Sequence, residues 1–195
     1  MPETIKTYLQ TWGLDPALFN LAITALAAFI VLAIAFRHRI ANWRENRQIA
    51  KLVRRLGVRS MRDLQLPDGT GGEVTLDYLL LARDCLLVVG IKRYSGLIFG
   101  GPKMDQWTQV INRVSYKFPN PDEYLLRQIN AVCALVPEVE VRGTHLFTHS
   151  AQFIRDKPAN VLSTRDLKRL PKRPQLKEIP AMLRKAWEQL HDSSP

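Results

Sequence analysis

The sequence predicts an α/β domain, a mixed sheet flanked by helices, preceded by a single transmembrane helix. Three observations support this prediction: an uncharged apolar run over residues 17–36, two apolar runs around a polar break at Arg83–Asp84, and short apolar runs that alternate with amphipathic patterns afterwards. Apolar runs that flank a short polar break are typical of a buried β-hairpin. Strands that alternate with helices favour a sheet covered by helices.

Residues 17–36 contain 20 residues without a charge, interrupted by the polar Asn20 and Thr24. At 1.5 Å per residue such a helix spans about 30 Å, the thickness of a bilayer core. A cleaved signal peptide is an alternative, because Ala33–Ala35 is a small-x-small site. The preceding region carries one base and two acids, which is atypical of a signal peptide. A buried helix of a soluble protein is a further alternative.

The basic residues that follow the apolar run predict its orientation. Only Lys6 precedes the run, and seven bases follow it within twenty residues: Arg37, Arg39, Arg44, Arg47, Lys51, Arg54 and Arg55. Positive charge stays on the cytoplasmic side. We therefore expect a single-pass protein of a bacterial inner membrane, with its N-terminus outside and its domain in the cytoplasm. Residues 37–56 continue as a basic helix that ends at Gly57.

The expected organisation follows the order of these segments. It comprises a short extracytoplasmic N-terminus (1–16), a transmembrane helix (17–36), a basic juxtamembrane helix (37–58), one domain (59–190) and a tail (191–195). Within the domain we expect strands over 97–100, 107–110, 141–148 and 159–162. Helices are expected to begin after Asn120, to follow a cap at Thr164 and to cover 179–190.

The charge balance favours a polyanionic partner. Beyond residue 36 the chain holds 27 bases and 16 acids, a net charge of +11. A basic domain binds nucleic acid or anionic lipid, and a soluble basic protein with neither partner is the alternative. Cys85 and Cys133 are isolated, so two reduced thiols are expected rather than a zinc site. A protein partner cannot be identified from the sequence.

The hairpin carries one acid and one base in otherwise apolar strands, and such charges are rarely buried without a partner or a task. Asp77 lies in the first strand and Lys92 near the end of the second. A tight turn at Arg83–Asp84 places position 77 opposite position 90, where a second carboxylate would complete a metal site. That position is Gly90.

Residues 64–128 resemble the nuclease-related domain (NERD) family of the PD-(D/E)XK, restriction-endonuclease-like superfamily. The counterparts of that family's pattern in this chain are Asp77, Gly90-Ile91-Lys92, Tyr94-Ser95-Gly96, Trp107, Asn120-Pro121 and Gln128, and the 13-residue spacing from Asp77 to position 90 fits the family. The chain departs from the family pattern in three respects. Gly90 replaces the motif Glu, Cys85 replaces the usual turn Gly, and the segment from Asn-Pro to Gln is longer than in most members.

The resemblance implies phosphodiester hydrolysis assisted by Mg²⁺. Asp77 and the Ile91 carbonyl would bind the ion, and Lys92 would stabilise developing negative charge. Glu45, on the preceding helix, is the candidate for the missing acid ligand; the alternative is a surface acid among arginines. The expected catalytic residues are thus Asp77, Lys92 and Glu45, of which Asp77 and Glu45 would also bind the metal. Gly90 is the degenerate motif position. Nucleic-acid contact or support of the site is expected from Gln128, Arg93 and Tyr94.

Other residues have plainer interpretations. A single Gln on a helix is more often a surface residue, so Gln128 has that alternative. His145 and His149 lie four residues apart on one strand, too far apart for one metal, and are expected to be core or surface histidines. Three functions stay open: a nucleic-acid-binding module with weak or no cleavage, an active Mg²⁺-dependent DNA nuclease, and a scaffold on the membrane surface.

Overall fold

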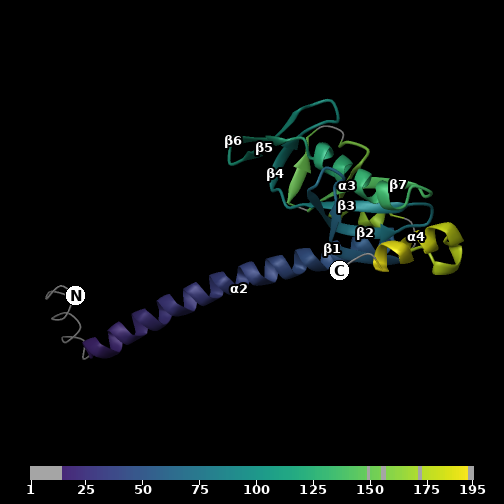
Figure 1. Cartoon of the computed structure of the whole chain (residues 1–195). Coiled ribbons are helices and arrows are strands. Elements are labelled where there is room, and N and C mark those ends of the chain that lie inside the picture. The colour runs from purple at the N-terminus through teal and green to yellow at the C-terminus, as the bar shows by residue number, and fades with distance from the viewer. Residues whose placement is uncertain (1–14, 149, 155–156, 171–172, 193–195) are drawn as a thin grey trace. The chain divides into compact units, whose positions relative to one another are not determined.

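Helix α2 runs without interruption from Pro16 to Leu56 in the computed structural model, which describes residues 15–148, 150–154, 157–170 and 173–192 (Figure 1). The Asp15 carboxylate accepts a hydrogen bond from the Ala17 N–H (2.8 Å), which satisfies a free donor of the first turn. The helix ends before Gly57, whose amide bonds to the Val53 carbonyl. The predicted continuation of the helix to residue 56 and its end at Gly57 are confirmed.

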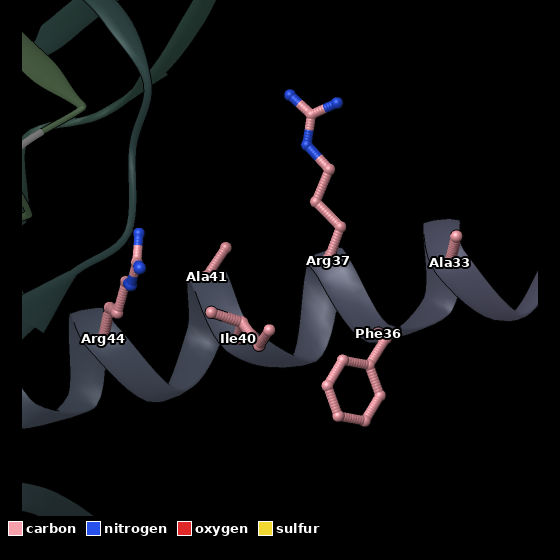
Figure 2. A pocket seen from close by; sticks show the side chains of 6 residues that line it. All are labelled: Ala33, Phe36, Arg37, Ile40, Ala41 and Arg44. Atoms are coloured by element: carbon pink, nitrogen blue, oxygen red, sulfur yellow. The ribbon is translucent and has the colours of Figure 1, made fainter.

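The first part of α2 exposes its apolar side chains; for example, 68% of the surface of Phe29 and of Leu32 is accessible. Among the helices described, α2 alone has the length and apolar composition to cross a membrane. Its most apolar 18-residue window has a mean hydropathy of 2.5, and a signal sequence near an N-terminus would share these properties. Figure 2 shows where the apolar segment gives way to the basic one: Arg37 and Arg44 project from one side of the helix, and Phe36 projects from the other.

The chain divides into two units, residues 1–46 and 47–195, and the second holds two sheets rather than the single sheet expected. The first sheet has the order β1-β2-β3-β7-β9, and the second has the order β6-β5-β4-β8 (Figure 1). Their strands are β1 (Arg59–Pro67), β2 (Glu73–Leu81), β3 (Leu86–Lys92), β4 (Gly96–Phe99), β5 (Gln106–Ile111), β6 (Val114–Pro119), β7 (Val141–Phe147), β8 (Ala151–Phe153) and β9 (Val161–Ser163).

Strands β1, β6 and β8 were not predicted. β1 lacks a clean alternation around Asp63, which takes a positive φ of 52° and whose pair with Asp77 is missing from an otherwise continuous antiparallel register with β2. β6 is almost wholly exposed, and β8 has only three residues, so neither carries an apolar signal. The hairpin of β2 and β3, by contrast, forms as expected, with Leu81 paired to Leu86.

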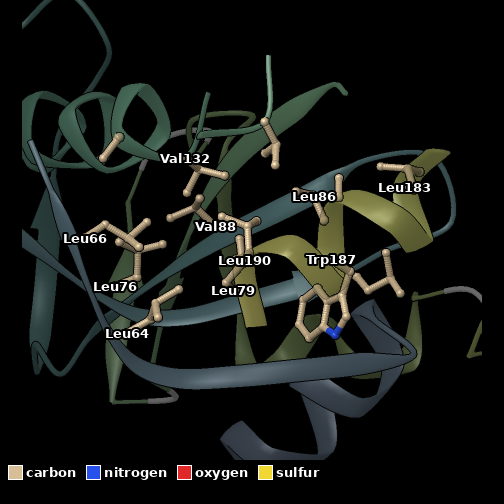
Figure 3. Packing of buried hydrophobic residues seen from close by; sticks show 14 of the residues in the cluster. Leu64, Leu66, Leu76, Leu79, Leu86, Val88, Val132, Leu183, Trp187 and Leu190 are labelled. Atoms are coloured by element: carbon tan, nitrogen blue, oxygen red, sulfur yellow. The ribbon is translucent and has the colours of Figure 1, made fainter. Parts of the chain in front are cut away.

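The first sheet is covered on both faces by helices, which confirms the predicted fold class. On one face lie α3 (Pro121–Leu135) and α4 (Ala181–Asp192), and Figure 3 shows Val132, Trp187 and Leu190 among leucines of the strands. On the other face, Leu52 and Val53 of α2 pack with strand residues. Burial of these apolar side chains is the main source of stability of such a layered domain.

Strands β3 and β7 are parallel, so the chain must cross over between them, and α3 lies in that connection. The Asn120 side chain caps α3 by accepting the Asp122 N–H (3.0 Å), as predicted. The cap of the later short helix, η1 (Thr164–Lys168), is Ser163 and not Thr164, because the Ser163 hydroxyl accepts the amide of Arg165.

Candidate functional site

The strands β2 and β3 separate at Asp77. Their ladder ends with the pair Tyr78–Val89, so position 77 falls opposite position 90, as expected. Beyond that pair, a carboxylate oxygen of Asp77 accepts the N–H of Ile91 (2.6 Å). A side chain thus takes the place of a main-chain ladder partner. The Asp77 carboxylate is thereby fixed beside the Gly90–Ile91 peptide.

Lys92 lies on the same stretch of β3, and its side chain is half-buried. Burial lowers the pKa of Lys92, and the nearby charge of Asp77 opposes that shift. A Cβ atom placed on Gly90 would lie 3.9 Å from Cε of Lys92. The structure therefore brings Asp77, Gly90 and Lys92 together, as the sequence predicted.

His145 of β7 is the parallel neighbour of Gly90 and is 1% exposed, which confirms the core interpretation. Its Nε2 lies 2.9 Å from Oδ1 of Asp122, which also accepts the Asn160 side-chain amide (2.7 Å). Because a carboxylate only accepts hydrogen bonds, the ring proton belongs on Nε2. Among the described residues the other nitrogen, Nδ1, has no hydrogen-bond partner. A Cβ on Gly90 would lie 3.4 Å from it.

Burial lowers the pKa of His145; the hydrogen bond to Asp122 opposes this shift, and the positive charge of Lys92 adds to it. The ring is therefore neutral at pH 7, with a lone pair on Nδ1. Sequence reasoning missed the contribution of Asp122 and Asn160 and the contact of His145 with Gly90. Pairing between strands more than fifty residues apart leaves no local signal.

Gln128 holds α3 against β2. The side chain is 2% exposed, so the surface interpretation was wrong, and its Nε2 donates to the Thr75 carbonyl (2.6 Å). One turn earlier, the Tyr124 hydroxyl donates to the same carbonyl (3.2 Å) and accepts the Thr75 N–H (3.3 Å). Both side chains fix β2 two residues before Asp77. A contact of Gln128 with metal or phosphate stays a prediction.

Residues 41–150 match the model of a family described as nuclease-related domain. The chain belongs to this family. An uncharacterized protein of Bacillus anthracis is 32% identical over 68 residues, which are 35% of this chain and 32% of that protein. The chain thus matches about a third of the length of this curated relative. No solved structure gives a significant match.

Several of the residues that carry the predicted motif serve the scaffold. Gly96 has a φ of +79°, and a Cβ there would lie 2.3 Å from the Val110 carbonyl oxygen, so only glycine fits. Trp107 is completely buried. The Tyr94 ring stacks on Phe118, with centroids 4.4 Å apart. Tyr94 therefore contributes to packing, and its contact with nucleic acid stays a prediction.

Two other predicted residues lie outside these contacts. Arg93 directly follows Lys92, and its side chain is exposed to solvent. Glu45 lies on α2 in the first unit, and its assignment as a metal ligand stays a prediction. His149 lies outside the described residues.

The described side chains around Gly90 do not fit a tightly held Mg²⁺ ion. Mg²⁺ requires a nearly octahedral set of oxygen ligands. In the part of the chain that the structure describes, no three His, Cys, Asp or Glu side chains are placed to share an ion. Asp77 supplies one carboxylate, and one of its oxygens already accepts the Ile91 N–H. The nearest other donor to Gly90 is a nitrogen, Nδ1 of His145.

Proposed function

We propose that this protein is a membrane-anchored, nucleic-acid-binding member of the nuclease-related domain family, with a degenerate metal site and weak or no cleavage in Mg²⁺. One observation carries the proposal: Asp77 and Lys92 remain beside each other where β2 and β3 separate, while Gly90 lacks a carboxylate. A site with one carboxylate would hold Mg²⁺ mainly through water, and hence poorly.

Exposed basic side chains on β3 and α3 support binding of a polyanion. Arg93 and Arg127 are both exposed, and the Arg127 guanidinium lies over the Tyr124 ring, 5.3 Å from its centroid. Arg127 is thus held on α3 next to Gln128, which contacts β2. Together with the net charge of +11 beyond residue 36, these groups favour contacts with phosphates, DNA being the expected partner.

Helix α2 supports the anchoring. Its exposed apolar segment is followed by exposed arginines, the order expected for a span whose C-terminal side faces the cytoplasm. A reporter fused after Pro195 should be active in the cytoplasm, and activity on the opposite side would refute the orientation.

Binding is tested on the full chain in nanodiscs of zwitterionic lipid, by fluorescence anisotropy with a duplex DNA of about 20 base pairs over a salt series. The logarithm of the affinity should fall with log[salt] by about 0.9 for each phosphate contact. Arg127→Ala should weaken binding and reduce the slope by about one contact. Arg184→Ala, an exposed arginine on α4, is the matched control and should change neither. A chain without affinity at low salt would leave only the scaffold function.

Cleavage is tested in the same preparation with Mg²⁺. We expect weak or no hydrolysis of the duplex. Strong hydrolysis that Asp77→Asn abolishes would contradict a degenerate site and support the active nuclease. Glu45→Gln would then show whether Glu45 supplies the second acid.

A further inference from the structure

The unpartnered nitrogen of His145 faces the space that the missing side chain of Gly90 leaves. Its Nδ1 is buried without a hydrogen-bond partner among the described residues, although buried polar atoms in proteins are nearly always paired. Within the described part of the chain, a Cβ on Gly90 would meet two heavy atoms within 4 Å outside its chain neighbours, Nδ1 of His145 and Cε of Lys92. Nδ1 therefore borders the space beside Gly90, and no described residue is its hydrogen-bond partner.

Three donor groups flank Gly90 on adjacent strands. β3 lies between β2 and β7, so the order across the sheet is Asp77, Gly90, His145. A strand residue directs its N–H and C=O toward the same neighbouring strand. Because the Ile91 N–H bonds to Asp77, its carbonyl also points to the side where β2 separates. The set is one carboxylate, one imidazole nitrogen and one carbonyl.

We propose that His145 replaces the motif acid as a ligand, so that this site prefers a divalent transition ion such as Co²⁺ or Zn²⁺ to Mg²⁺. Imidazole suits such ions, whereas Mg²⁺ takes oxygen ligands. The inference rests on the proposed function in one respect, that Asp77 is a metal ligand. It adds a ligand that the motif does not contain and a different class of ion.

The contacts on the far side of the ring fit this role. Metal-binding histidines usually donate their second N–H to a carboxylate, which fixes the tautomer and the ring orientation. Here Nε2 donates to Asp122, which Asn160 in turn holds by an amide hydrogen bond. Asp122 begins α3 beside its cap, Asn120, so the carboxylate is fixed by the start of a helix. Asp122 is thus a positioning residue.

Ion binding is measured by isothermal titration of Co²⁺ and of Mg²⁺ into the untagged full chain in detergent, together with the visible absorption of bound Co²⁺. We expect one Co²⁺ per chain at this site, bound about tenfold or more tightly than Mg²⁺. His145→Gln keeps an amide donor for Asp122 and removes Nδ1, so it should abolish this site. Asp122→Asn should weaken Co²⁺ binding by about 10–100-fold. His191→Gln, at an exposed histidine, is the matched control and should bind as the natural chain does.

Gly90→Ala gives a second test that leaves His145 intact. Its methyl group would occupy the space at ordinary contact distance from Nδ1, so the fold should be kept and Co²⁺ binding should be lost. Unchanged Co²⁺ binding in folded His145→Gln or Gly90→Ala, or equal affinity for Mg²⁺, would overturn the inference. A chain that binds DNA but does not bind Co²⁺ would refute this inference alone. A chain that binds Co²⁺ but does not bind DNA would refute the proposed function alone.

Discussion

Gly90→Glu should convert the site to one that binds Mg²⁺. The backbone of Gly90 lies outside the left-handed region, and a Cβ would lie 3.4 Å from Nδ1 of His145 and 3.9 Å from Cε of Lys92, both ordinary contacts. The Cβ atom of the new side chain therefore fits without a clash. Glycine is itself unfavourable within a strand, so the backbone loses nothing by the change. The added carboxylate enters the space between Asp77 and His145.

The expected gain in Mg²⁺ affinity is large because two carboxylates, that of Asp77 and the new one at position 90, would then face the ion. Two unit charges 4 Å apart interact by about 4 kcal/mol at an effective dielectric constant of about 20. Attraction to Lys92 and the burial of a charge reduce the gain. If only about a third of it remains, roughly 1.4 kcal/mol, Mg²⁺ still binds about tenfold more tightly. Nuclease activity that is absent or faint in the natural chain should rise with it.

Calorimetric titration of Mg²⁺ and a duplex-cleavage assay measure these two effects in detergent-solubilised full chain. Gly90→Gln has the same size without the charge and should gain neither. Adding Asp77→Ala or Lys92→Ala to Gly90→Glu should abolish the gain in cleavage. The reasoning fails if folded Gly90→Glu binds Mg²⁺ no better than Gly90→Gln. Equal, strong cleavage by the natural chain and by Gly90→Glu would show that another acid, with Glu45 the candidate, already completes the site.

Three predictions concern the scaffold and are checked by thermal and denaturant unfolding of the full chain in detergent. Asn120→Ala removes the cap of α3 and should destabilise the domain by about 1 kcal/mol, and unchanged stability would contradict the capping role. Gly143→Ala places a methyl 2.8 Å from Cγ of Leu125 where α3 packs on β7, so a loss of about 1–3 kcal/mol is expected, and a neutral effect would show that α3 can shift. Burial raises the pKa of Asp166, but the hydrogen bonds from Lys157 and a backbone N–H outweigh it and lower that pKa. The stability from Asp166 is therefore present above its unfolded pKa of about 3.9 and is lost as the pH falls below that value. Asp166→Asn should flatten the fall of the unfolding free energy at low pH, and an unchanged fall would refute the assignment.

The parts of the fold that could be predicted are those specified within a few residues of sequence. The hairpin was read from two apolar runs and a polar break, and its register placed Asp77 against Gly90. The N-cap of α3 was read from Asn120 and Pro121. β1 was not predicted because its alternation is lost around Asp63, which has a positive φ. β6 was not predicted because its side chains face solvent. Neither strand carries the period-two apolar pattern on which such a prediction depends.

The candidate site was half predictable for the same reason. Asp77, Gly90 and Lys92 lie within one hairpin, and their geometry follows from antiparallel pairing. The partners of His145 come from the start of α3 and from the segment before β9. The parallel register of β3 and β7 brings His145 itself beside Gly90. Parallel neighbours are joined by long crossovers, so no local spacing reveals which residues meet. The buried nitrogen became informative only once its neighbours were known.

The fold of this chain and the proposed chemistry of the site place different demands on its residues. Gly96 is required by a positive φ and the close approach of Val110, and Trp107 fills the core of the second sheet; these demands hold whether or not an ion binds. Gly90 meets no such demand, since a Cβ there makes only ordinary contacts. A change at position 90 can therefore remove or alter the chemistry while the fold and the match to the family persist. Whether this chain binds an ion, and which one, is for that reason a more direct test of its function than its resemblance to other nuclease-related domains.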